Sequence, residues 1–485
     1  MNLKMMGRFI GQIVAVEAVF LLPAAAISAF RGEWAALAGF GWTLAIMLAV
    51  CGVLYALCRK AGRIFGAREG LVCVGISWVV MSILGCLPFW FSGAIPNYVD
   101  ALFETVSGFT TTGSSILSDV EALPKGLLYW RSFSHWVGGM GVLVFIMAFL
   151  PLSGGRNMHI MKAESPGPSV SKLVPRVRTT AIWLYGIYFV LSLIMFILLL
   201  CGGMPTFDAL CTTFGTAGTG GFSVRDDGMN SYSPLIQVLV GIFMLLFSIN
   251  FESYFALIQR KWRDILTTEV VTFLLIVAAA VGLITWNLYS SQLAGLGGSA
   301  PDSLRHAFFT VSSLISTTGF ATVDYDLWPT LSISVLLLLY FIGACAGSTG
   351  GGIKISRIVI LFKSIAREIG NSIHPKRVKK ITVDKKVVEQ ETVHSVLTFF
   401  TCFAFLFAAS LLLISIDGKD FLTNFSAVAT TIGNVGPGFS GVGPTKNFAD
   451  FSILSKLVLS FDMLAGRLEL FPMLVLFSPA TWKKY

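Results

Sequence analysis

A short stretch rich in threonine and ending at a glycine occurs in four related versions along the chain. The versions read LFETVSGFTTTGSS, ALCTTFGTAGTGGF, FFTVSSLISTTGFA and FSAVATTIGNVGPG, and they are anchored on Gly113, Gly220, Gly319 and Gly436. Glycine lacks a Cβ atom and readily adopts the positive φ needed to turn a carbonyl inward. Rings of backbone carbonyl oxygens can replace the water shell of a cation. The four stretches therefore predict backbone segments that coordinate a dehydrated cation.

The residues predicted to present these carbonyls lie at the anchor glycines and directly before them. They are Thr111, Thr112, Gly113, Thr219, Gly220, Thr318, Gly319, Val435 and Gly436. The anchors recur at intervals of roughly 100 to 120 residues, which indicates one unit duplicated into four. Kinks of glycine and threonine between packed helices are the alternative, but such kinks need not recur with the same flanking sequence. We expect four half-length helices that enter a membrane and end at one shared path.

A second cluster of glycines lies between residues 343 and 352, where five of ten residues are glycine. Glycine costs roughly 1 kcal/mol per helical position relative to alanine, so this density predicts a break in an apolar helix. We call the apolar run that follows each of the four stretches a return span, and no other return span has such a cluster. A tight helix crossing is the alternative to a gating role. The candidate gate residues in the cluster are Gly347, Ser348, Thr349, Gly350, Gly351 and Gly352.

One arginine, Arg467, lies in an apolar run near the end of the chain. A charge inside the membrane is costly and is by default a functional candidate. Arg467 could form an electrostatic barrier in a cation path or bind carbonyls of the glycine-rich cluster, and we add it to the candidate gate. An ion pair with Asp462 or Glu469 is the structural alternative. Three further polar residues have no assigned role, namely Asn250, Glu252 and Lys354.

The composition excludes a soluble globular protein, because 55% of the 485 residues are hydrophobic and only 13% are charged. A helix of about 20 apolar residues crosses a bilayer. Ten such runs occur, at residues 9–29, 42–57, 71–91, 133–150, 180–200, 235–257, 270–289, 331–363, 393–416 and 453–477. We expect an all-α polytopic membrane protein of four M1–P-loop–M2 repeats with pseudo-fourfold symmetry around one pore, plus two N-terminal helices.

The predicted division of the chain follows these runs. Residues 1–66 hold the two N-terminal transmembrane helices, and pore repeats occupy residues 67–155, 156–263, 264–365 and 366–485, the third with the gating cluster. Most of the 35 lysines and arginines lie in loops at one face, which predicts that both termini are cytoplasmic. Acidic residues on the opposite segments could form a cation vestibule, or they could serve loop solubility alone. These residues are Asp100, Glu104, Asp119, Glu121, Asp208, Asp226, Asp227, Asp302, Asp324, Asp326, Asp417, Asp420 and Asp450.

Motifs of other protein classes are absent or incomplete. The eight cysteines form no CxxC pair and the five histidines have no metal-ligand spacing. The run from Gly436 to Gly441 fits GxGxxG, but no strand precedes it and no helix follows, so it does not indicate a nucleotide site. No GxSxG occurs, and Ser348 and Thr349 have no obvious histidine partner, which disfavours an intramembrane hydrolase. We expect no enzyme activity, no cofactor other than a transported ion and no nucleic acid partner.

The four loops, the run GACAGSTGGGIK from Gly343 to Lys354 and the AGR ending at Arg467 resemble the Trk/Ktr/HKT superfamily of potassium transporters, and specifically the bacterial Trk membrane subunit of the TrkH/TrkG type. The resemblance covers essentially the whole chain. It implies potassium uptake across the bacterial inner membrane, rubidium accepted in place of potassium, and an intramembrane loop that must move for conduction. It also implies a homodimer regulated by a separate cytosolic ring that binds NAD(H) or ATP.

Ion preference and the cytoplasmic partners remain open at this point. All four anchors are glycine, which favours potassium, because sodium-preferring relatives in the superfamily commonly carry serine at the first. A sodium-permeable or H⁺/Na⁺-coupled cation transporter is the alternative. Residues 363–391 form the longest basic loop. It could be a solvated linker, lie against anionic membrane lipid, or dock the regulatory subunit.

Overall fold

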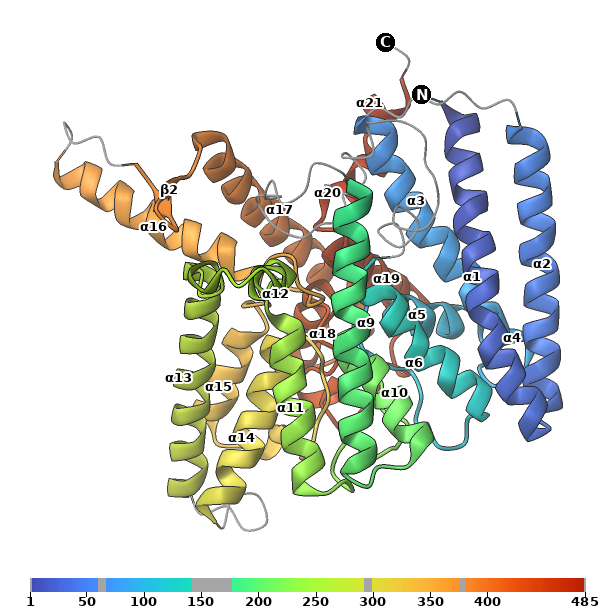
Figure 1. Cartoon of the computed structure of the whole chain (residues 1–485), viewed down its shortest axis with the longest axis horizontal. Coiled ribbons are helices and arrows are strands. Elements are labelled where there is room, and N and C mark those ends of the chain that lie inside the picture. Colours follow the sequence, from blue (N-terminus) through green and yellow to red (C-terminus); the bar gives the residue numbers. More distant parts are fainter. Residues whose placement is uncertain (1, 60–66, 142–176, 292–298, 375–379, 484–485) are drawn as a thin grey trace.

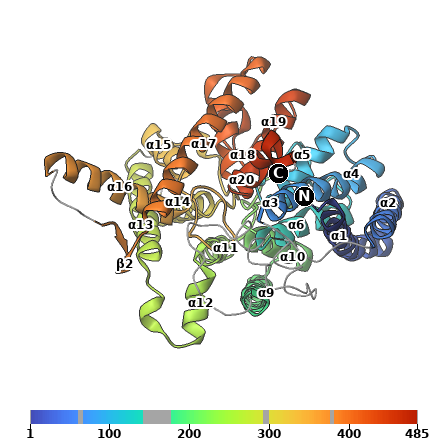
Figure 2. The same cartoon turned by 90° about the horizontal axis from the view of Figure 1, so that it is seen from above.

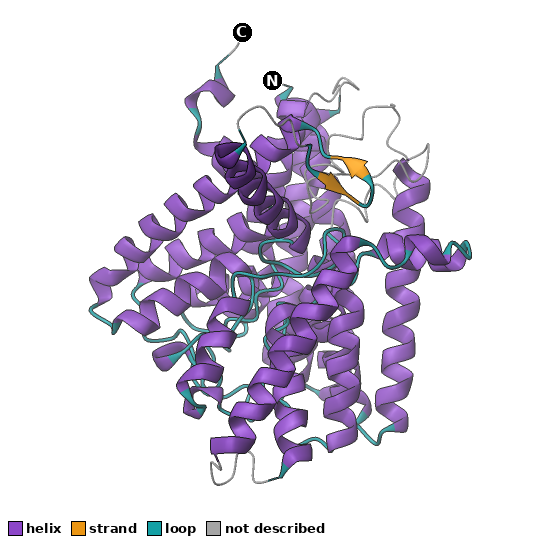
Figure 3. Ribbon diagram, turned by 90° about the vertical axis from the view of Figure 1, so that its left-hand side faces the viewer, coloured by secondary structure: helices purple, strands orange, loops and turns teal. Residues whose placement is uncertain are grey.

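The computed structural model describes residues 2–59, 67–141, 177–291, 299–374 and 380–483 (Figure 1). This part of the chain is mostly helical, as expected, and its single sheet is the antiparallel hairpin of β1 (Thr382–Val383) and β2 (Lys386–Val387), shown in orange in Figure 3. The helices, in chain order, are α1 (Leu3–Arg31), α2 (Trp34–Cys58), α3 (Ala67–Gly85), α4 (Leu87–Phe91), α5 (Tyr98–Phe109), α6 (Lys125–Gly139), α9 (Val177–Cys201), α10 (Thr206–Ala217), α11 (Pro234–Ser248), α12 (Phe251–Ile258), α13 (Thr268–Ser291), α14 (Ala300–Ile315), α15 (Thr330–Leu339), α16 (Ile355–Ile373), α17 (Gln390–Ile414), α18 (Phe421–Gly433), α19 (Ile453–Arg467), α20 (Phe471–Phe477) and α21 (Pro479–Trp482).

Six helical stretches in the described ranges are long and apolar enough to cross a bilayer. They are Leu3–Arg31, Trp34–Cys58, Arg68–Phe91, Ala181–Cys201, Thr268–Ser291 and Gln390–Asp417. The pair α11 and α12 passes the same test but is bent by 89°. Large apolar side chains on these helices face outward, among them Leu48, Leu275 and Phe405. Such exposed apolar surface is unfavourable in water and indicates contact with lipid.

Three of the four return spans are broken within the described residues. The span expected at 331–363 is broken between α15 and α16, at the glycine-rich cluster, as predicted. Two other return spans, which lack such a cluster, are also broken. Span 235–257 breaks where Ile249 is extended and the Asn250 side chain caps α12, and span 453–477 breaks where Glu469 and Leu470 adopt positive φ. The span expected at 133–150 extends beyond Gly141, outside the described residues.

Four short helices, α5, α10, α14 and α18, have 12, 12, 16 and 13 residues. At 1.5 Å per residue, a helix of this length spans roughly 18 to 24 Å and cannot cross a hydrocarbon core of about 30 Å. Figure 1 shows α10 and α14 beginning at the lower end of the molecule and ending inside it. The last turns of all four helices are buried. Their C-terminal ends therefore lie within the protein rather than at its surface.

The first two helices pack along each other and lie at one edge of the molecule, with α16 at the opposite edge (Figure 2). Small residues allow this close packing. A Cβ atom on Gly39 of α2 would lie 2.9 Å from the Pro88 carbonyl oxygen and 3.1 Å from the Ser92 amide nitrogen at the end of α4. The backbones of α2 and α4 thus touch at Gly39, and this contact attaches the outer helix to the body of the protein.

We predict that Gly39→Leu lowers the thermal stability of the detergent-solubilised protein, because an overpacked site typically costs about 1–3 kcal/mol. Gly41→Leu is the matched control, since a Cβ atom at Gly41 of the same helix has no neighbour within 4 Å. The measurement is the melting temperature from size-exclusion chromatography after heating. Equal melting temperatures for the two variants would contradict this account of α2 packing.

Candidate functional site

The four short helices end in the same backbone geometry. Two residues with positive φ follow each helix, separated by one residue. The first is Thr111 (φ 54°), Thr219 (56°), Thr317 (60°) or Asn434 (53°), and the second is the glycine Gly113 (86°), Gly221 (75°), Gly319 (84°) or Gly436 (105°). The amide between them donates to a carbonyl five residues earlier, at N–O distances of 2.8 to 2.9 Å. This is the hydrogen bond of a Schellman cap. We refer to residues 110–114, 218–222, 316–320 and 434–438 as the first to fourth loops.

Threonine is an uncommon residue for this geometry. A positive φ is costly for a β-branched side chain, by roughly 1–2 kcal/mol. Thr111, Thr219 and Thr317 all carry this strain, whereas asparagine at Asn434 tolerates it better. Strained backbone persists only where surrounding contacts hold it, and it concentrates at functional sites.

The backbone corrects the predicted register of the second loop. Gly221, and not Gly220, has the positive φ that Gly113, Gly319 and Gly436 share. The sequence offers two adjacent glycines here, and the hydrogen bond from the Gly220 amide to the Gly215 carbonyl decides between them. Three residues of the shared geometry were therefore missing from the predicted set, namely Thr317, Asn434 and Gly221. An asparagine directly after a helix is a known C-cap signal and could have identified Asn434.

The four loops lie against one another in cyclic order. A Cβ atom built on each loop's glycine would meet a carbonyl oxygen of the next loop: Gly113 meets Gly220, Gly221 meets Thr318, Gly319 meets Val435, and Gly436 meets Thr112 at 2.8 Å. Side chains also close the ring between the fourth and first loops. Ser114 Oγ donates to the Gly436 carbonyl at 2.8 Å, and Asn434 Nδ2 donates to Thr112 Oγ1 at 2.9 Å. Only glycine fits at these four positions.

The glycine-rich loop, residues 343–354, is closed at its base by backbone hydrogen bonds. The Gly343 amide donates to the Ile353 carbonyl at 2.9 Å, and the Ile355 amide donates to the Ala344 carbonyl at 3.3 Å. One carboxylate holds both flanks, because Glu269 Oε1 accepts from the Ala346 amide at 2.7 Å and from the Ser356 amide at 3.0 Å. The loop is thus an anchored excursion between α15 and α16 rather than an irregular stretch of helix.

The tip of the glycine-rich loop contacts three of the first to fourth loops, which together form a ring. The Thr349 carbonyl accepts from Thr219 Oγ1 of the second loop at 3.0 Å. The Gly351 amide donates to Thr317 Oγ1 of the third loop at 2.6 Å. A Cβ atom on Gly351 would lie 2.8 Å from Asn434 Cβ of the fourth loop. The candidate gate and the candidate ion site are therefore in direct contact.

Arg467 binds the glycine-rich loop through its guanidinium group. It donates to the Thr349 carbonyl at 2.8 Å and to the carbonyls of Gly138 and Gly139 at 2.5 and 2.7 Å. Of the contacts considered from the sequence, the structure therefore shows Arg467 bound to a carbonyl of the glycine-rich cluster. Glu469 forms its ion pair with Arg357 instead. Asp462 accepts from Ser410 Oγ at 2.8 Å.

A cavity of about 70 Å³ lies beside the glycine-rich loop, lined in part by Gly139, Gly351, Lys354, Arg467 and Glu469. The buried Lys354 ammonium donates to the Gly350 carbonyl and, at 3.4 Å, to the Gly351 carbonyl. Lys354 and Arg467 thus place two positive charges next to the loop.

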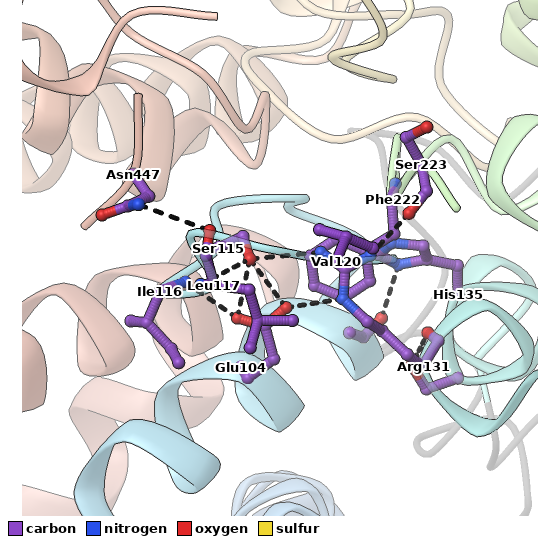
Figure 4. Close-up of polar contacts among 12 residues, drawn as sticks. Glu104, Ser115, Ile116, Leu117, Val120, Arg131, His135, Phe222, Ser223 and Asn447 are labelled. Atoms are coloured by element: carbon purple, nitrogen blue, oxygen red, sulfur yellow. Dashed lines mark hydrogen bonds and ion pairs between the residues drawn. The ribbon is translucent and has the colours of Figure 1, made fainter. Parts of the chain in front are cut away.

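Some of the acidic residues expected at an outer vestibule form ion pairs within the protein. Glu104 is buried and pairs with Arg131 at 2.6 Å (Figure 4), so its assignment to a vestibule is wrong. Asp100 pairs with Lys456 at 2.6 Å. Asp326 lies in the loop after α14, where burial, followed by the neighbouring Asp324 charge, raises the pKa of its carboxyl to about 6. The sequence alone could not show which acidic residues form ion pairs, because their partners are distant in the chain.

Comparisons with known proteins agree over all or most of the chain. A family model described as TrkH, cation transport protein, matches residues 39–484. The Trk system potassium uptake protein TrkH of Salmonella typhimurium is 35% identical over 496 residues and 100% of both chains, and TrkG of Escherichia coli is 33% identical over 99% of each. The crystal structure of the potassium transporter TrkH from Vibrio parahaemolyticus matches with a TM-score of 0.88 at 31% identity, covering 100% of both chains. The chain therefore belongs to the TrkH family of cation transport proteins, a family of transporters and not of enzymes.

Proposed function

We propose that this chain takes up potassium across the bacterial inner membrane, through a pore that the four loops surround. Four units of span, half-helix and span would give the pore pseudo-fourfold symmetry. The observation that carries the proposal is the cyclic contact of four loops with matching backbone geometry. The relatives named as potassium uptake proteins support the choice of ion.

The proposed ligands are carbonyl oxygens of the first to fourth loops. They include the positions expected from the sequence, with Gly221, Thr317 and Asn434 added by the backbone geometry. The negative ends of the four helix dipoles also favour a cation where α5, α10, α14 and α18 meet. Potassium is the transported ion, and we propose no resident cofactor.

The glycine-rich loop is the proposed gate, and its present position is the closed one. It lies against three of the four loops and carries the Arg467 and Lys354 contacts. Opening requires the loop to exchange these contacts for others. A shift of only 1.4 kcal/mol changes the ratio of open to closed molecules by about tenfold.

The topology and partners form the remaining part of the proposal. Figure 1 places the start of α1 and the end of α20 at the same end of the molecule as α16 and the β hairpin. The positive-inside rule makes this end cytoplasmic. A cytosolic ring that binds NAD(H) or ATP would dock there, and the protein would be a homodimer in contact with membrane lipid. The resemblance to the Trk system supports these partners.

The test is reconstitution of the purified chain in liposomes, with flux measured for potassium, rubidium and sodium. We expect potassium and rubidium to pass faster than sodium, without a proton gradient. Equal sodium flux would favour a sodium-permeable path, and flux that follows an imposed proton or sodium gradient would favour a coupled transporter. An absence of any ion flux in both the folded wild-type protein and the folded variant lacking residues 347–352 would refute the proposal.

We predict that Gly113→Ser lowers the preference for potassium over sodium before it abolishes conduction. The new Cβ atom would overlap the Gly220 carbonyl and would also be strained at a φ of 86°, at a cost of about 1–3 kcal/mol. The matched control is Gly93→Ser, because Gly93 has a φ of 73° and no atom within 4 Å of the new Cβ. Both variants are reconstituted and their flux ratios compared. An unchanged ratio for Gly113→Ser would remove Gly113 from the ion site.

Arg467→Ala is expected to increase cation flux, because it removes a positive charge from the path and the bond to the Thr349 carbonyl. Arg467→Lys keeps the charge but cannot donate to three carbonyls with the same planar fork. Flux and melting temperature are measured for both variants. A lower melting temperature without any rise in flux would give Arg467 a structural role only.

Deleting residues 347–352 is expected to raise basal rubidium flux and to leave ion preference unchanged. The base of the loop, with Gly343 paired to Ile353 and Ala344 to Ile355, lies outside the deletion and would be closed by a two-residue turn. The measurement uses liposomes without any cytosolic partner. Should the folded, selective deletion variant conduct only at the wild-type level, the loop is not the gate.

A further inference from the structure

Two basic side chains of α6 lie behind the first and second loops, on residues that are one helical turn apart. We infer that Glu104, Arg131 and His135 form a brace that fixes the distance between these two loops and thereby sets the ion preference of the pore. This inference rests on the proposed function. It assigns positioning roles to three buried residues that do not line the ring.

Arg131 reaches both loops through separate nitrogen atoms (Figure 4). Its Nη1 donates to the Ser223 carbonyl at 2.9 Å, directly after the second loop, and its Nη2 donates to Ser115 Oγ at 3.2 Å, directly after the first. The guanidinium carbon also lies 3.5 Å from the centre of the Phe222 ring. A planar group with several donors can hold two backbone segments at one separation.

Glu104 completes the ionic part of the brace. Its Oε1 accepts from Arg131 Nε at 2.6 Å and from Ser115 Oγ at 2.9 Å, and its Oε2 accepts from the Ile116 amide at 2.9 Å. Both side chains are almost fully buried, with 0% and 3% exposure for Glu104 and Arg131. A buried ion pair of this kind contributes geometric specificity where its hydrogen bonds are satisfied.

One turn further along α6, His135 joins the second loop to the end of α5, which leads directly into the first loop. Its Nδ1 lies 2.8 Å from the Gly108 carbonyl in the last turn of α5, and its Nε2 accepts from the Phe222 amide at 3.3 Å. These partners assign the proton to Nδ1, because a carbonyl can only accept. A Cβ atom on Gly220 would overlap the His135 ring. The imidazole therefore supports the second loop from behind, at the position next to Gly221.

The other contacts between loops use different chemistry in the described residues. Tyr340, directly after α15, donates through its Oη to the Pro437 carbonyl of the fourth loop at 2.7 Å. The Met229 amide donates to the Ala321 carbonyl at 2.9 Å, where the segments after the second and third loops meet. Removing the ionic brace should therefore disturb one of the four interfaces and leave the rest of the ring in place. We expect altered selectivity rather than complete loss of transport.

The test is the double variant Glu104→Gln/Arg131→Met, which removes the pair without leaving a single buried charge. We expect its rubidium-to-sodium flux ratio in liposomes to fall by about tenfold, equivalent to 1.4 kcal/mol. The matched control is Asp100→Asn/Lys456→Met, because Asp100 lies one turn before Glu104 on α5 and its ion pair also measures 2.6 Å. The control should keep the wild-type ratio, and a flux ratio does not depend on the amount of active protein.

Further variants make every outcome decisive. Arg131→Lys keeps the positive charge but loses the planar guanidinium that donates to both loops. His135→Gln keeps one hydrogen-bond donor and one acceptor. Both variants should lower the rubidium-to-sodium flux ratio in folded protein, and His135→Gln should lower it less. A wild-type ratio in the folded double variant overturns the inference, as does an equal fall in the control. Loss of folding in both the double variant and Arg131→Lys would assign the pair to stability alone and also overturn it. A wild-type protein without any rubidium preference would instead refute the proposed function.

Discussion

The close approach of four backbone loops is the constraint on which the rest of this structure depends. Each loop brings a glycine so near to a carbonyl oxygen of the next that no side chain fits. Three of the loops also hold a threonine at positive φ. Neither feature is favourable by itself, since carbonyl oxygens repel one another and the threonine backbone is strained. The surrounding protein must therefore supply the contacts that keep the loops together.

Those contacts differ from one interface to the next. An arginine–glutamate pair and a histidine lie behind the first and second loops, the Tyr340 hydroxyl at the end of α15 binds the fourth loop, and an asparagine and a serine link the fourth and first. A single chain can hold each interface with its own side chains, whereas four identical subunits cannot. The shared backbone geometry is therefore compatible with four different supports, and a change in one support need not disturb the others.

The glycine-rich loop is connected to the same assembly through its polar groups. Its tip donates to and accepts from the ring loops, Glu269 holds its flanks, and Arg467 and Lys354 bind its carbonyls. Glycine makes this arrangement possible because the loop backbone lies directly against Gly433 and Asn434. Movement of the loop would have to exchange these hydrogen bonds, because buried polar groups left unpaired are costly.

Local composition alone determined the membrane class, the positions of the four loops and the break at the glycine-rich cluster. These features follow from apolar run length and from glycine content, which act over neighbouring residues. Only the tertiary structure decided that Gly221 rather than Gly220 takes the shared position, that Asn250 and Leu470 interrupt two more spans, and that Glu104 is buried. Each of these depends on hydrogen bonds or packing that the local pattern does not specify. The partners of Arg467 illustrate the reason, because Thr349 and Gly138 lie 118 and 329 residues away in the chain and are brought to it by folding.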